Sequence, residues 1–347
     1  MKQHEREYFV SRIRCGFYTL KEDGFNLKIY MPTPEDEYEI NQVYIDAYEK
    51  ALDDDFKTED EMFEWMKSKE LWMEKDEQKI EGLKKDIERL KVEIFNARNN
   101  EKLKETIRMY LRAGERQLSQ QYEKKNIYQI NTCEGIAILE KSVAFLKKCT
   151  FLNGELYDFN SLSADYILNK YYSIILNDSQ IRNLARNEPW RSLWLLNDSK
   201  AIDLFNNKGR ALSVDQRNIL IWSSMYDNVQ ESLDCPAEDI INDDDMLDGW
   251  FIIQKKKREK ERAEAEMESS IQNPKIKNST ELFFVANSEK DIERIESMND
   301  IGSRIVKQQR LNTIKQKGGV AEQTDFFDEK LKLTQKSNES YRNIMRR

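Results

Sequence analysis

Four aspartates crowd one short stretch of the sequence, at Asp243, Asp244, Asp245 and Asp248. Carboxylates that converge on one point can hold Mg²⁺ beside a phosphate, which would allow phosphotransfer or nuclease chemistry. Asp243, Asp245 and Asp248 are the candidate metal ligands. A calcium-binding loop does not fit, because Leu247 stands where its third ligand is needed. No second carboxylate cluster or glycine-rich phosphate loop supports a metal site.

The same aspartates also suit the start of a helix. Their side-chain oxygens can accept hydrogen bonds from the first N–H groups, and negative charge is favourable at the positive end of a helix. Metal catalysis needs several converging groups, which this one cluster does not supply. We therefore expect the aspartates to cap a helix and to bind neither metal nor cofactor. Metal-dependent phosphotransfer or nuclease activity at residues 243–248 is the alternative.

Other reactive groups are scarce. The one histidine is His4, and both nucleophilic triads and many metal sites need a positioned imidazole. The cysteines Cys15, Cys133, Cys149 and Cys235 are widely spaced without a CxxC pair, so we expect free thiols in a reducing compartment. The sequence thus predicts a protein that is not an enzyme.

Three arginines, Arg182, Arg186 and Arg191, lie near Trp190 in the sequence. Guanidinium groups bind phosphates and carboxylates. A phosphate site would also need a nearby glycine that lets the anion approach the backbone, and none is present. We therefore favour stacking of arginine on tryptophan within a packed core.

The composition indicates a mainly helical protein. Of 347 residues, 39% are hydrophobic and 35% charged, and only 5 prolines and 11 glycines interrupt helices. The net charge of −8 argues against nucleic acid as a partner. No apolar run of about 18 residues predicts a membrane span, and the first residues lack the apolar core of a signal peptide. We expect a cytoplasmic protein that is not secreted.

Residues 1–73 predict a small α+β unit. Residues 25–31, FNLKIYM, alternate apolar and polar side chains as a strand does, and the stretch that starts at Tyr8 could be its hairpin partner. Thr33 followed by Pro34 marks one helix start, and Thr58 with Glu61 forms a capping box for another.

Residues 74–125 predict a long, coiled-coil-like helical hairpin. The first arm carries apolar residues in steps of three and four, the pattern breaks at residues 97–101, and it then resumes. Two antiparallel helices joined at Asn99 and Asn100 fit best. One continuous helix is an alternative, as is a cellular coiled-coil adapter that dimerises through residues 80–118. The apolar positions are Ile80, Leu83, Ile87, Leu90, Ile94, Leu103, Ile107, Tyr110, Leu111 and Leu118.

Residues 126–254 predict a helical globular core. Thr132 can cap one of its helices, and Ser213 with Gln216 forms a third capping box. Four of the six tryptophans fall in this stretch, and such rings usually fill cores.

Residues 255–347 predict a charged helix followed by an extended arm that other chains order. Six of the eight residues 255–262 are basic, but Glu259 and Glu261 interrupt them and no aromatic residue interleaves, so we expect a solvated helix. Beyond it, short apolar segments would contact partner subunits. The predicted partner-binding residues are Phe283, Phe284, Ile292, Ile295, Ile301, Ile305, Phe326 and Phe327.

Three segments between residues 180 and 262 carry a resemblance. LARNEPWRSLW, ALSVDQRNILIWSSMYDNV and DDDMLDGWFIIQKKKREKE resemble sequences of tailed-bacteriophage virion and assembly proteins, as does the Lys-, Asn- and Ile-rich composition. The resemblance implies a structural, scaffolding or tail-assembly role in a virion or the host cytoplasm, and it carries no catalytic residues. We therefore expect a non-enzymatic protein that binds other protein subunits, with self-association also open.

Overall fold

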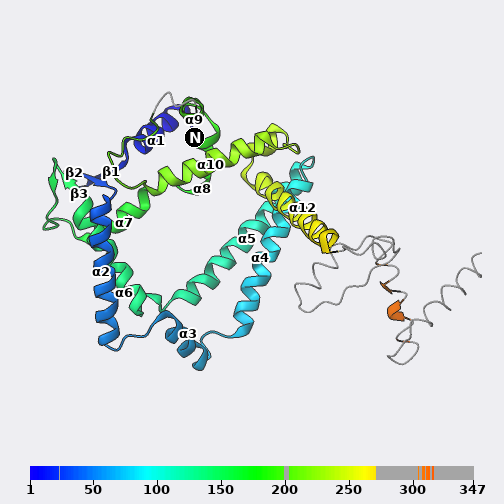
Figure 1. Ribbon diagram of the computed structural model, residues 1–347, viewed down its shortest axis with the longest axis horizontal. Helices are drawn as coiled ribbons and strands as arrows, with labels where there is room; N and C mark the ends of the chain where they lie inside the picture. The colour runs from blue at the N-terminus through cyan, green and yellow to red at the C-terminus, as the bar shows by residue number, and fades with distance from the viewer. Residues whose placement is uncertain are drawn as a thin grey trace, which may run out of the picture. The chain divides into compact units, whose positions relative to one another are not determined.

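The computed structural model describes residues 1–22, 24–198 and 203–270, with a few positions between 304 and 315. It divides into two compact units, Met1–Ile252 and Ile253–Arg347. The described residues form twelve α-helices, one 3-10 helix and a small antiparallel sheet of four strands (Figure 1). The predicted mainly helical fold with a small N-terminal α+β portion is therefore confirmed.

The N-terminal strand pair begins later than the sequence predicts. Residues 8–15, which we expected in a strand, belong instead to helix α1 (Gln3–Cys15). Val10 and Ile13 lie one turn apart on its buried side, and Gly16 ends the helix with a left-handed backbone at φ 74°. Strands β1 (Phe17–Glu22) and β2 (Phe25–Tyr30) then form the predicted antiparallel pair.

Two further strands extend this sheet from far along the chain. The strand order is β1-β2-β3-β4, in which β3 (Thr150–Leu152) and β4 (Glu155–Leu156) follow a helix of the predicted core region. Leu27 of β2 lies opposite Leu152 of β3, and the Leu27 side chain is fully buried. The sheet thus joins the N-terminal segment to residues about 120 positions away.

The capping signals place the helix starts correctly. Thr33 caps α2 (Pro34–Asp53), and Thr58 forms its capping box with Glu61 at α3 (Glu59–Ser68). Thr132 caps α6 (Cys133–Cys149), which packs antiparallel to α2. These confirmed starts depend on local hydrogen bonds, which sequence spacing reveals directly.

The predicted hairpin is confirmed, and the continuous-helix alternative is wrong. Helix α4 (Glu74–Asn96) packs against α5 (Glu101–Asn126), and Asn100 caps α5 by accepting a hydrogen bond from the Leu103 N–H at 3.2 Å. A 3-10 helix, η1 (Gln129–Asn131), follows. The buried apolar residues of the hairpin are Ile80, Ile87, Ile94, Ile107 and Leu111.

Most of the remaining helices pack around an apolar cluster in which Trp190 is fully buried. Its indole N–H donates to Ser223 Oγ at 2.7 Å, so its polar atom is satisfied inside the core. Ser213 and Gln216 form the predicted capping box of α10. These helices are α8 (Asp178–Arg186), α9 (Trp190–Asp198), α10 (Val214–Glu231), α11 (Glu238–Ile241) and α12 (Asp244–Ser270). Helix α7 (Ala164–Ile174) packs instead into a second cluster with Leu27 and Ile29 of the sheet.

Helix α12 includes the charged run that begins at residue 255, as the sequence predicts. Among the described residues, no helix is both long and apolar enough to cross a bilayer. The eight predicted partner-binding residues, from Phe283 to Phe327, lie outside the described residues.

Candidate functional site

The four aspartates lie at the start of α12, as the capping interpretation predicts. Asp243 precedes the helix, and its Oδ1 accepts a hydrogen bond from the Met246 N–H at 3.2 Å. Its backbone oxygen accepts the Leu247 N–H at 2.9 Å, which begins the helical hydrogen-bond pattern. Asp244 and Asp245 occupy the first turn, where negative charge is stabilised.

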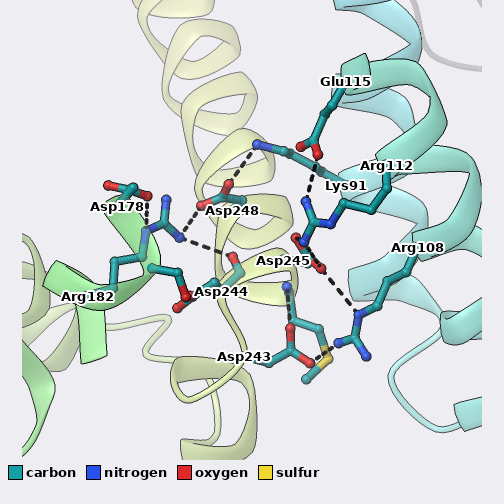
Figure 2. A network of polar contacts seen from close by, with 12 residues as sticks. Lys91, Arg108, Arg112, Glu115, Asp178, Arg182, Asp243, Asp244, Asp245 and Asp248 are labelled. Atoms are coloured by element: carbon teal, nitrogen blue, oxygen red, sulfur yellow. Dashed lines mark hydrogen bonds and ion pairs between the residues drawn. The ribbon is translucent and has the colours of Figure 1, made fainter. Parts of the chain in front are cut away.

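Helix capping is only part of their role, because the aspartates also form ion pairs with three other helices. Asp248 bridges two of them (Figure 2): its Oδ1 lies 2.7 Å from Arg182 Nη1 on α8, and its Oδ2 lies 2.7 Å from Lys91 Nζ on α4. One carboxylate thus joins the helical hairpin to the helical core.

The other three aspartates divide between the same two sides. Asp244 accepts from Arg186 of α8 at 2.6 Å and from the Ser179 hydroxyl at 3.0 Å. Asp245 and Asp243 face α5 instead. Both oxygens of Asp245 lie within 2.9 Å of Arg112 Nη2, and Arg108 contacts both Asp245 and Asp243 (Figure 2).

Arg182 shows how this junction keeps a buried cation charged. Its guanidinium carbon lies 3.9 Å from the ring centroid of Trp222, and its side chain is 9% exposed. Burial opposes the charge, but Asp248 and then Asp178 raise the pKa of Arg182 above its ordinary value overall. The expected stacking of arginine on tryptophan is confirmed here.

The stacking partner is Trp222, however, and not the neighbouring Trp190 that the sequence suggested. Trp190 stacks on Phe205. Arg186 instead donates to the Tyr226 hydroxyl at 3.1 Å, and Arg191 pairs with Asp227. The arginines near Trp190 therefore bind protein carboxylates, which sequence proximity could not identify.

Gly249 lets α12 approach the hairpin closely enough for these ion pairs. A Cβ atom at this position would lie 2.3 Å from the backbone oxygen of Lys91 and 2.9 Å from Cβ of Phe95. On either side of Gly249, the buried Leu247 and Trp250 pack into the core cluster around Trp190. The contact between α4 and α12 thus depends on the absence of a side chain at residue 249.

Met246 completes the junction on the hairpin side. It is 3% exposed and packs with Ile94, Ile107 and Leu111, the buried residues near the turn of the hairpin. Apolar and ionic contacts therefore hold α12 between the same two parts of the chain.

Sequence reasoning missed the hairpin residues Lys91, Arg108 and Arg112 and the packing role of Gly249. Arg108 and Arg112 are four positions apart, so they share one face of α5, and this spacing was the only local signal. Their partners lie more than 130 positions along the chain. Such a pairing follows from tertiary contact and leaves no fixed spacing in the sequence.

The arrangement serves to join helices more readily than to perform catalysis. Each of the four carboxylates lies within ion-pair distance of an arginine or lysine, so a metal ion would have to compete with those cations. Across the described residues, no three histidine, cysteine, aspartate or glutamate side chains converge as metal ligands would.

A separate cavity of about 270 Å³ lies between α3 and the end of α5. Met66 and Tyr128 contribute to its apolar lining, and Glu59 and Asp60 to its acidic part. Lys125 in its wall pairs with Glu77 at 2.6 Å, outside the lining. The cavity does not include the aspartates of α12.

No protein-family model matches the sequence, and searches of curated proteins and of solved structures found no match.

Proposed function

We propose that this chain is a non-enzymatic structural or assembly protein that acts through contacts with other protein subunits. The observation that supports this most directly is the use of Asp243, Asp244, Asp245 and Asp248. These carboxylates were the strongest candidates for chemistry in the sequence, and each is engaged in joining α12 to the hairpin or to α8.

The hairpin would contribute its outer surface to such contacts. Its buried residues already pack within the chain, and Met246 and Ile240 cover them near the turn. Leu103, Met109 and Tyr110 of α5 are large apolar residues that remain exposed. A coiled-coil adapter that dimerised through the buried face of residues 80–118 would have to separate α4 from α5 first.

The proposed setting is a phage virion or tail, or the host cytoplasm in which it is assembled. It rests on the sequence resemblance of residues 180–262 to tailed-phage virion proteins. In the structure those residues form most of the tryptophan-containing core and the start of α12. The resemblance therefore concerns the scaffold, and the partner contacts are assigned to the hairpin surface and to the residues after 254.

Truncation after Gln254 tests this proposal. We expect residues 1–254 to remain folded, because the core cluster and the aspartate junction lie within the unit Met1–Ile252. The shortened chain should no longer co-purify with, or enter, the assembly that the full chain joins. A matched control truncates only after residue 330 and keeps Phe283, Phe284, Phe326 and Phe327.

Two results would contradict the proposal. One is normal incorporation of the chain that ends at Gln254. The other is turnover of a substrate by the purified, partner-free protein that is lost when Asp244 and Asp245 are both changed to asparagine.

A further inference from the structure

Helix α2 has a strongly negative net charge. This helix carries seven acidic residues and one lysine, a net charge of −6 in a chain whose net charge is −8. Two more aspartates, Asp54 and Asp55, follow directly. Asp36 forms the capping box of α2 with Thr33, and Glu39 pairs with Lys148 of α6, so part of this charge serves the fold. Asp46, Glu49 and Asp53 do not belong to the aspartate junction.

The outer side of α2 also exposes large apolar residues at regular spacing. Only Ile40 and Ala51 of this helix are buried. On the opposite side, Tyr38, Ile45 and Leu52 recur every seven positions and are 73%, 46% and 49% exposed. Apolar residues that recur at heptad spacing on one exposed side of a helix are typical of a contact surface.

A row of acidic residues runs beside this apolar row on the exposed side of α2. Asp46, Glu49 and Asp53 are all exposed and follow the spacing i, i+3, i+7. A partner that fits this face must offer positive charge together with side chains that cover Ile45 and Leu52. Lysine and arginine do both, because their hydrocarbon stems pack on apolar surface while their charged ends reach carboxylates.

The chain itself contains a matching basic surface. Residues 255–262 of α12 hold six basic and two acidic residues, a net charge of +4, and all of them are exposed. Lys255, Arg258 and Arg262 follow the same spacing i, i+3, i+7 as the acidic residues of α2. From its first to its third residue, each row spans about 10 Å along its helix at 1.5 Å per residue, so the two rows match in length.

We propose that the acidic outer face of α2 in one copy of this chain binds the basic segment 255–262 of α12 in a second copy. The inference rests on the proposed function, since it names one partner of a chain that acts by subunit contacts. Asp46 would pair with Lys255, Glu49 with Arg258, and Asp53 with Arg262, with Ile45 and Leu52 under the basic stems.

Exposed ion pairs are individually weak and are screened over about 10 Å at 0.1 M salt. The association should therefore need protein on the order of 100 µM and should depend strongly on salt. Sedimentation of the full chain should give a mean mass above the monomer value of 41.4 kDa at low salt. Raising the salt about tenfold should return it to the monomer value.

Charge reversal gives the sharper test. An acid-reversed variant carries Asp46→Lys, Glu49→Lys and Asp53→Lys, and a base-reversed variant carries Lys255→Glu, Arg258→Glu and Arg262→Glu. Each variant alone should be monomeric at low salt, because its two surfaces then have the same sign. An equimolar mixture should associate again, since the reversed α2 of one variant complements the reversed segment 255–262 of the other, and the two native surfaces pair as in the unaltered chain.

A control variant has the same change in net charge as the acid-reversed variant. It reverses three exposed acids of the hairpin, Glu81→Lys, Glu88→Lys and Glu105→Lys. It should associate as the unaltered chain does. Circular dichroism of every variant should show helix content no lower than that of the unaltered chain, since lysine and glutamate are both good helix formers.

Several results would overturn the inference. The wild-type chain could stay monomeric at low salt. Either reversed variant alone could associate as strongly as the wild type, or the equimolar mixture could fail to associate. Binding of a DNA duplex by the wild type that the base-reversed variant loses would also overturn it, by assigning residues 255–262 to nucleic acid. In each case, co-purification of other subunits with the wild type would still support the proposed function. If no other subunit co-purified, both this inference and the proposed function would be contradicted.

Discussion

Replacing Gly249 with alanine tests whether α12 is held tightly against the hairpin. In an open helix position, glycine to alanine stabilises a protein by about 1 kcal/mol, because alanine has the better helix propensity. At Gly249 the new Cβ would lie 2.3 Å from the backbone oxygen of Lys91. Ordinary contacts lie at about 3.5–4.0 Å, so the two helices would have to separate by about 1 Å or more.

The expected outcome is a net loss of stability. Overpacking costs about 1–3 kcal/mol, and the upper end applies because the obstacle is backbone that cannot change rotamer. Separation would also lengthen the ion pair between Asp248 and Lys91, now at 2.7 Å. After subtracting the gain in helix propensity, we expect Gly249→Ala to lower the free energy of unfolding by about 2 kcal/mol.

Gly82 provides the matched control within α4. A Cβ atom there meets nothing within 4 Å, so Gly82→Ala should raise the free energy of unfolding by about 0.5–1 kcal/mol. Urea denaturation followed by circular dichroism measures both variants. If Gly249→Ala is as stable as Gly82→Ala, the close contact between α12 and α4 does not exist as described.

Three further predictions concern an ion pair, a cap and buried acidic groups. A double-mutant cycle of Arg182→Met and Asp248→Asn should give a coupling energy of about 1–3 kcal/mol in urea denaturation, and a value near zero would contradict the ion-pair account. Asn100→Ala should cost about 1 kcal/mol by removing the cap of α5, with faster amide exchange in its first turn as the local readout. Burial raises the pKa of the Cys149 thiol from 9.0 to about 12, and of the Tyr18 phenol from 10.0 to about 12. The unfolded chain therefore loses these protons at lower pH than the folded chain does. Because the folded chain then binds more protons, the free energy of unfolding should fall as the pH rises from 9 toward 12. Cys149→Ala should reduce that slope by up to about 1.4 kcal/mol per pH unit, and an unchanged slope would exclude the thiol as a cause.

Local signals in the sequence predicted the helix starts and the hairpin well. Thr33, Thr58 and Ser213 each cap a helix through hydrogen bonds to residues three positions away, so spacing alone reveals them. The turn at Asn100 follows from a break in the apolar pattern. Residues 8–15 form a helix, although a short stretch of mixed apolar and polar residues fits a strand and a helix alike. The local signal for the helix is Gly16, which ends it in a left-handed conformation.

The partners of the aspartates could not be predicted in the same way. Lys91, Arg108 and Arg112 are ordinary charged residues of a solvated hairpin when viewed in sequence. Their pairing with α12 follows from the apolar packing of Met246 and from the close approach at Gly249. Both are properties of the assembled fold, and the sequence indicates only that each residue could take part.

We infer that Asp243, Asp244, Asp245 and Asp248 join helices instead of holding a catalytic metal. Thermal unfolding of the wild type and of Asp248→Asn, each with and without millimolar Mg²⁺, tests it most directly. We predict that Asp248→Asn lowers the unfolding temperature by the same amount in both conditions, and that Mg²⁺ leaves the wild type unchanged. A Mg²⁺-dependent rise in the wild type that Asp248→Asn abolishes would contradict the claim.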